Sequence, residues 1–211
     1  MSEGGGEVSA PESGASLRGG ASVPRAGGMR WRLAYLFAAA AVLMADQASK
    51  AWAVSRLRTG EVVKLWDGYV QFAYAENPGI AFGRLQDGGD FGRWMLVGLA
   101  SLAVVGLLLY FFRTKRTDDR VLGAVALLLA GVAGNLTDRV RLGHVIDFIE
   151  VFLGSYQWPT FNVADAAICT GAALLALDLI LEGRAEGRRQ KAAAAAARPQ
   201  AANGTDAGRG A

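Results

Sequence analysis

The chain has 211 residues, of which 52% are hydrophobic, and its formal net charge is +3. So small a charge does not indicate a nucleic-acid partner. With one cysteine, Cys169, and one histidine, His144, the chain cannot form an intramolecular disulfide framework, a multi-cysteine metal site or a histidine-rich zinc site. The hydrophobic residues are clustered in long stretches, which is typical of a membrane protein.

Residues 1–28 are rich in Gly and Ser. They bury too little apolar surface to offset their ordering entropy, so we predict a disordered tail. An apolar stretch follows at 33–53. It contains Asp46 and Lys50, which are four residues apart and so share a helical face on which they can pair. Because the stretch continues in helical register past residue 46, we interpret it as a retained first span and not as a cleaved signal peptide.

The next segment, 54–93, contains two β-prone runs separated by Asp67-Gly68, and Asn77-Pro78-Gly79 is a turn signal. We therefore predict a small β-cradle between the first and second helices. The second helix is predicted at 94–112, where 19 residues carry no charge. A helix of that length extends over about 30 Å, which is the thickness of the hydrocarbon core of a membrane.

Two further apolar stretches complete the predicted membrane domain at 29–183. The third, 121–137, has no polar residue until Asn135, and Asp138 and Arg139 lie on the same helical face as Asn135. The fourth, 163–181, directly follows Asn162 and contains Asp165 in its first turn. Residues 184–211 are rich in Ala, Gly and Arg, and we predict a second disordered tail with a helix-favouring run at 190–197. The predicted fold class is an all-α polytopic membrane protein with four transmembrane helices and a small extracytoplasmic β-cradle.

Basic residues predict the orientation of these helices. The short segment 113–120 has four basic residues in eight, and basic residues also flank the first and fourth spans. Segments with such an excess face the cytoplasm. Both termini are therefore predicted to be cytoplasmic, and the loop 54–93 is predicted to lie outside.

Polar residues gather near the predicted outer boundary of the spans. Each alone has an ordinary explanation as an ion pair, a snorkelling side chain or a helix-start residue. Their common depth instead indicates a functional site, because ionisable groups in a membrane are costly. The polar residues of this group are Asp46, Lys50, Asn135, Asp138, Arg139, Asp147, Asn162 and Asp165.

Two of these carboxyls, Asp147 and Asp165, are suited to aspartic protease chemistry. Like charges in close proximity cannot both ionise, so one carboxyl keeps a proton as the acid while the other acts as a base. Two other classes stay open at this point. One is a small proton- or ion-coupled transporter subunit, whose charges would be spread through the depth of the spans. The other is a non-enzymatic membrane scaffold, which would leave the Asp pair unexplained.

Five motifs in this order resemble the bacterial lipoprotein signal peptidases, or signal peptidase II family. They are Asp46-Gln47-Ala48-Ser49-Lys50, Asn77-Pro78-Gly79-Ile80-Ala81-Phe82, Gly134-Asn135-Leu136-Thr137-Asp138-Arg139, Val145-Ile146-Asp147-Phe148 and Phe161-Asn162-Val163-Ala164-Asp165. Each motif alone is weakly specific, but the ordered set on a four-span frame is very specific. The resemblance covers roughly residues 31–183.

This resemblance implies an aspartic endopeptidase of the bacterial inner membrane that acts as a monomer without a metal or an organic cofactor. Its substrates would be prolipoproteins carrying a diacylglyceryl group, cut just before the lipidated cysteine. The resemblance makes Asp147 and Asp165 the catalytic pair. It places Asn77, Asn135, Arg139 and Asn162 around that pair, near the outer leaflet, and it assigns Asp46 and Lys50 to ordering the end of the first span.

Overall fold

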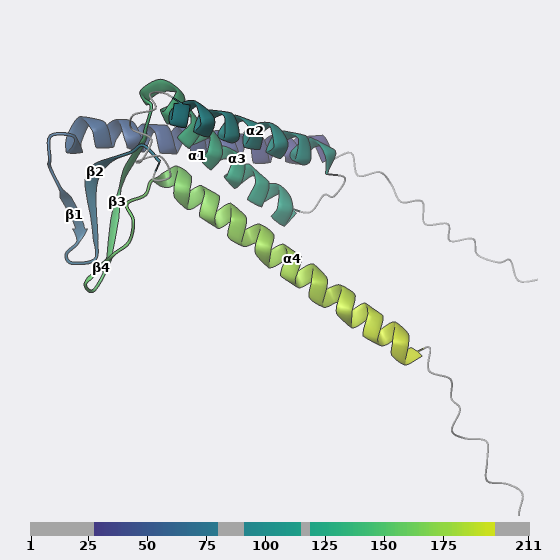
Figure 1. Ribbon diagram of the computed structural model, residues 1–211. Coiled ribbons are helices and arrows are strands. Elements are labelled where there is room, and N and C mark those ends of the chain that lie inside the picture. The colour runs from purple at the N-terminus through teal and green to yellow at the C-terminus, as the bar shows by residue number, and fades with distance from the viewer. Residues whose placement is uncertain (1–27, 80–90, 115–118, 197–211) are drawn as a thin grey trace, which may run out of the picture.

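The computed structural model describes residues 28–79, 91–114 and 119–196 (Figure 1). The predicted N-terminal tail therefore lies outside the described residues, apart from Gly28. So do Ile80, Ala81 and Phe82 of the second motif. The elements in chain order are α1 (Gly28–Leu57), β1 (Val63–Trp66), β2 (Val70–Asn77), α2 (Phe91–Arg113), α3 (Asp119–Leu142), β3 (Val145–Leu153), β4 (Tyr156–Gln157) and α4 (Val163–Ala196).

Three helices, α2, α3 and α4, are long and apolar enough to cross a membrane. Helix α1 is long enough, but Asp46, Gln47 and Lys50 lower the hydropathy of its second half. Within the described residues the structure thus gives three candidate spans, whereas the sequence predicts four.

Helix α3 is the centre of the bundle and packs against α1, α2 and α4. Its buried face is made largely of small residues, including Ala124, Ala126 and Ala130. By contrast, α2 exposes large apolar residues along its length: Leu99, Leu102, Val105 and Leu109. An apolar surface of this extent matches a helix that faces lipid.

Two glycines of α3 allow this close packing. A Cβ atom on Gly131 would lie 2.3 Å from the carbonyl oxygen of Ala164, and one on Gly134 would lie 2.5 Å from Oδ2 of Asp46. Neither distance is possible for a real side chain. Glycine at these positions therefore allows α3 to approach both the start of α4 and the carboxylate of α1.

The four strands form one antiparallel sheet in the order β1-β2-β3-β4. Strand β2 pairs with β3 so that Ala75 lies opposite Asp147 and Asn77 lies opposite Val145. The β-structure predicted between the first and second helices is present as β1 and β2, and the sheet is completed by β3 and β4 from the segment between α3 and α4. A two-stranded hairpin is only marginally stable, and β3 gives it the third strand that it needs.

The sheet is attached to the C-terminal end of α1 by an aromatic cluster. Trp52 of α1 contacts Phe72 of β2 edge-on, with ring centroids 5.4 Å apart, and Phe148 of β3, with centroids 6.4 Å apart. Phe72 and Phe148 also contact each other at 5.8 Å. This packing fixes the sheet across one end of the helices (Figure 1).

The predicted disordered C-terminal tail is in part helical, because α4 continues through residues 184–196 to Ala196. Ala, Glu, Arg, Gln and Lys make up most of this segment, and all five favour helix. Their propensity outweighs the two glycines at 183 and 187.

Candidate active site

Asp165 lies in the first turn of α4, where a reciprocal cap fixes it. Oδ1 of Asn162, the residue preceding the helix, accepts the backbone N–H of Asp165 at 2.9 Å. Oδ2 of Asp165 in turn accepts the backbone N–H of Asn162 at 3.2 Å. This is the geometry of a capping box. The helix-start role considered for Asp165 therefore exists, and it leaves the other oxygen of its carboxyl available for a second contact.

Asp147 lies near the start of β3 and is almost fully buried. Its Oδ1 accepts Nδ2–H of Asn162 at 2.7 Å, and its Oδ2 accepts Nδ2–H of Asn77 at 2.9 Å. The amide of Asn77 is itself oriented, because its Oδ1 accepts the N–H of Gly79 at 2.9 Å. The turn after β2 thus directs the Asn77 donor toward Asp147.

Two asparagines connect the two aspartates. Asn162 contacts both, since its Oδ1 caps Asp165 while its Nδ2 donates to Asp147. Asn135 of α3 donates from Nδ2 to Oδ1 of Asp165 at 2.8 Å. Its Oδ1 accepts both Lys50 Nζ at 3.0 Å and Asn162 Nδ2 at 3.2 Å. These contacts determine which end of each amide faces which carboxyl.

Burial raises the pKa of Asp147 from 3.8 to about 6. The charge of Asp165 raises it as well, while hydrogen bonds from Asn77 and Asn162 lower it. Burial has the largest effect because it penalises the ionised form. Asp147 therefore keeps its proton at a pH where an ordinary aspartate has lost it.

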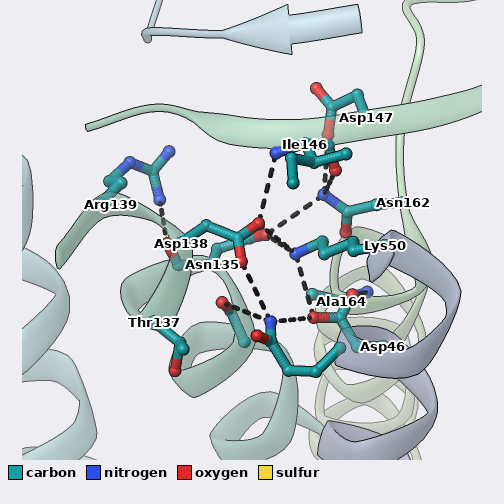
Figure 2. A network of polar contacts seen from close by, with 12 residues as sticks. Asp46, Lys50, Asn135, Thr137, Asp138, Arg139, Ile146, Asp147, Asn162 and Ala164 are labelled. Atoms are coloured by element: carbon teal, nitrogen blue, oxygen red, sulfur yellow. Dashed lines mark hydrogen bonds and ion pairs between the residues drawn. The ribbon is translucent and has the colours of Figure 1, made fainter. Parts of the chain in front are cut away.

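A buried ionic network lies beneath Asp147 (Figure 2). Nζ of Lys50 is 2.9 Å from a carboxylate oxygen of Asp46 and 2.9 Å from one of Asp138. All three side chains are at most 3% exposed. Nε2 of Gln47 donates to Asp46 at 3.1 Å and to Asp138 at 3.0 Å. One cation thus holds two buried carboxylates, with an amide bridging them.

This network holds the backbone beside each candidate catalytic residue. Oδ1 of Asp46 accepts the N–H of Ala164 at 2.9 Å, and Ala164 directly precedes Asp165. Oδ2 of Asp138 accepts the N–H of Ile146 at 3.2 Å, and Ile146 directly precedes Asp147. By holding Asp46 and Asp138 together, Lys50 therefore fixes the start of α4 relative to the start of β3.

Arg139 lies at the C-terminal end of α3, beside the aspartates. Its Nη1 donates to the backbone oxygen of Asn135 at 3.4 Å, and its buried Nε has no hydrogen-bond partner within the described part of the chain. Arg93 of α2 caps this end of α3 by donating to the backbone oxygen of Arg139 at 2.9 Å. Arg139 thus carries an unused donor close to two carboxyls.

The eight side chains that the sequence singles out join one connected hydrogen-bond and ion-pair network. The sequence placed Asp138 in this polar group without a role, and the structure shows that Asp138 pairs with Lys50. Gln47 was not predicted as a member of the group, although it lies inside a quoted motif and donates to Asp138. The group lies at one end of the bundle, which is unlike the spread of charges expected of a transporter. Among the described residues, no cluster of His, Cys, Asp and Glu could hold a metal ion.

Comparison with known proteins shows the family. The signal peptidase (SPase) II family matches residues 38–181. The lipoprotein signal peptidase of Syntrophus aciditrophicus is 39% identical over 147 residues, which cover 69% of this chain and 91% of that protein. The lipoprotein signal peptidase of Geobacter sulfurreducens is 42% identical over 144 residues, which cover 67% of this chain and 88% of that protein. The chain therefore belongs to the signal peptidase II family, as the motifs indicate, and is a peptidase by class.

Solved structures agree with this assignment. Two structures described as a bacterial membrane enzyme, determined by the in meso method at 2.3 and 1.9 Å resolution, are each 25% identical to this chain. Their TM-scores are 0.62 and 0.64. They cover 71% and 69% of this chain, and 89% and 92% of their own chains are matched.

Proposed function

We propose that this protein is a membrane-embedded aspartic endopeptidase that removes signal peptides from diacylglyceryl-modified prolipoproteins, cutting just before the lipidated cysteine. The observation that carries the mechanism is the position of Asn162, which contacts both Asp147 and Asp165. Family membership and the names of the curated relatives support the substrate class.

The chemistry follows from two carboxyls that share a proton. The ionised carboxyl takes a proton from water, and the resulting nucleophile attacks the scissile carbonyl carbon. The protonated carboxyl polarises the carbonyl oxygen and then protonates the leaving amine. The raised pKa of Asp147 supports its presence in the protonated form.

Arg139 is suited to bind the substrate beside this pair. Its guanidinium lies close enough to Asp165 and Asp147 to interact with both charges, and it would donate to a carbonyl oxygen held at the pair. Asn77 and Asn135 hold the two carboxyls in orientation. Both carboxyls and all of these supporting residues come from one chain, which supports action as a monomer.

The arrangement also supports a membrane topology. We infer that α1 crosses the membrane with α2, α3 and α4, because it packs against α3 and α4 within the same bundle and its charged residues are neutralised by partners there. The sheet would then form a cradle on the outer face of the bacterial inner membrane, with both termini in the cytoplasm. A precursor anchored by its lipid would meet the Asp pair at that surface.

The proposal is tested by changing each aspartate to asparagine. Asp147→Asn and Asp165→Asn should each lower cleavage of a diacylglyceryl-modified precursor by about 100-fold or more, because asparagine cannot take up or release the proton. Asp178→Asn is the matched control, since Asp178 is a buried aspartate of α4 outside the network. Near-normal turnover by either of the first two variants, in folded protein, would contradict the catalytic assignment.

A further inference from the structure

The outer ends of the two hairpins carry exposed aromatic pairs. Trp66 and Tyr69 flank the β1–β2 turn and are 66% and 50% exposed. Tyr156 and Trp158 follow the β3–β4 turn and are 56% and 51% exposed. The rings contact each other within each pair, with centroids 4.8 Å and 6.5 Å apart. Water-facing hairpin ends are normally polar, so these four rings need an explanation.

The two hairpin ends form a single apolar tip. The N–H of Phe152 in β3 donates to the oxygen of Tyr69 at 2.8 Å, which joins one hairpin to the other. Leu65 and Leu153 add further exposed apolar surface beside the rings. A hollow of about 280 Å³ opens at this tip, and Trp66, Tyr69 and Phe152 are among the residues that line it. Neither Asp147 nor Asp165 lines this hollow, so the tip is distinct from the candidate active site.

The position of the tip indicates what covers it. The strands run across one end of the helices, and the turns reach out beyond the bundle on the side where α4 lies (Figure 1). With the helices crossing a membrane, as in the proposed function on which this inference rests, the tip lies over lipid. Tryptophan and tyrosine are the side chains that settle at the membrane–water interface, because one part of each ring is apolar and another forms hydrogen bonds.

We propose that this tip, formed by Trp66, Tyr69, Tyr156 and Trp158, inserts into the interfacial region of the outer leaflet and acts as a second membrane anchor. At the β1–β2 end of the tip, Lys64 and Asp67 neutralise each other at 2.9 Å. Beside the other hairpin, Glu150 accepts hydrogen bonds from Gln71 and Gln157. Insertion therefore depends on apolar and aromatic contact and not on anionic lipid. A zwitterionic phosphatidylcholine membrane is sufficient to bind it.

The anchor has a consequence for the active site, because one strand connects the two. Asp147 lies six residues before Leu153 in β3. In an extended strand this separation is about 20 Å. An anchored tip therefore sets the depth of Asp147 relative to the leaflet, where the lipid-linked cysteine of a precursor is held.

The test uses proteins that each keep a single tryptophan, with the other four replaced by phenylalanine. Variants that keep only Trp66 or only Trp158 are placed in phosphatidylcholine vesicles with and without brominated lipid, and loss of emission is measured. The variant that keeps only Trp94, which is exposed at the start of the candidate span α2, is the control for membrane insertion. Acrylamide in the water reports exposure to solvent, and circular dichroism confirms that each variant is folded.

We expect brominated lipid to quench Trp66 and Trp158 to an extent comparable with Trp94, and acrylamide to quench them only weakly. Adding anionic lipid should not change either result. Quenching of Trp94 without quenching of the tip residues would overturn the anchor and leave the spans intact. Absence of quenching at Trp94 would instead contradict the membrane topology. Shielding of the tip from both quenchers would also overturn the proposal, since a protein partner would then cover it.

Discussion

Asn162 gives the clearest view of how single side chains build this site. Its carbonyl oxygen caps α4 and its amide nitrogen donates to Asp147, so one residue both starts the helix and aligns the two carboxyls. Asn77 has a narrower role, because it donates only to Asp147 among the two aspartates. A hydrogen bond to an ionised carboxylate stabilises the charged form and lowers the pKa.

Removing the Asn77 donor should therefore raise the pKa of Asp147 above its value of about 6. The free enzyme then keeps its shared proton to a higher pH, and the alkaline limb of kcat/KM moves upward in pH. We expect Asn77→Ala to shift this limb by about one pH unit, because a hydrogen bond to a charged group contributes about 1.5 kcal/mol or more. The measurement is the pH profile of kcat/KM for precursor cleavage.

Tyr74→Phe provides the comparison for this shift. Tyr74 lies in the same strand but donates to Glu76 at 2.9 Å, away from Asp147. Its pH profile should coincide with that of the unchanged protein. An alkaline limb that does not move in Asn77→Ala would mean that Asn77 does not stabilise the ionised form of Asp147.

At the scale of elements, Lys50 joins α1 to α3. In the described part of the chain it is the only cation between the buried carboxylates of Asp46 in α1 and Asp138 in α3. Lys50→Met should destabilise the fold by about 3–5 kcal/mol, because it leaves two carboxylates buried without a counter-charge. Asp46→Asn should cost less, since Lys50 keeps Asp138 and an amide oxygen can still cap Ala164. Thermal unfolding of the detergent-solubilised protein measures both effects.

Lys64→Met is the matched control for this prediction. Lys64 and Asp67 are also 2.9 Å apart, but their side chains are 65% and 83% exposed. Exposed ion pairs contribute little, so this variant should unfold at nearly the same temperature as the unchanged protein. Equal effects of Lys50→Met and Lys64→Met would show that burial of the Lys50 network does not determine its importance.

Packing of α3 against α1 and α4 gives a second prediction at the level of elements. Gly134→Ala places a Cβ atom 2.5 Å from Asp46 Oδ2 and 3.2 Å from the Cβ of Ala164. The helices must then separate, which should cost about 1–3 kcal/mol and lower cleavage by displacing the start of α4. Gly98→Ala on α2 meets nothing within 4 Å and should leave unfolding temperature and activity unchanged. Normal activity of Gly134→Ala would show that the site tolerates a wider gap between α3 and its neighbours α1 and α4.

At the scale of the whole molecule, the orientation of the protein in the membrane can be measured in intact cells. Thr59 follows α1 near the sheet, and Asp119 begins α3 at the opposite end of the bundle. In a Cys169→Ala background, Thr59→Cys should react with an impermeant thiol reagent and Asp119→Cys should not, because the basic segment 113–120 keeps that end in the cytoplasm. The reverse labelling would place the Asp pair on the cytoplasmic side and exclude its action on translocated precursors.

At the scale of the whole chain, the sequence by itself determined the features that depend on near neighbours. Apolar stretches of sufficient length predicted α2, α3 and α4, which the structure contains. Spacings of three and four residues predicted that Asp46 pairs with Lys50 and that Asn162 and Asp165 lie together at a helix start. The ordered motifs predicted the family to which the chain belongs.

Only the tertiary structure decided how these local pieces meet. The contact of Asp46 with the N–H of Ala164 joins residues 118 apart in sequence, and the contact of Asn77 with Asp147 joins residues 70 apart. Asp138 completes the Lys50 network, and β3 joins the hairpin of β1 and β2, through contacts of the same long-range kind. Helical and strand periodicity reports only which residues share a face, because it repeats over two to four residues. Which faces meet depends on close packing at Gly131 and Gly134, and that packing exists only in the folded bundle.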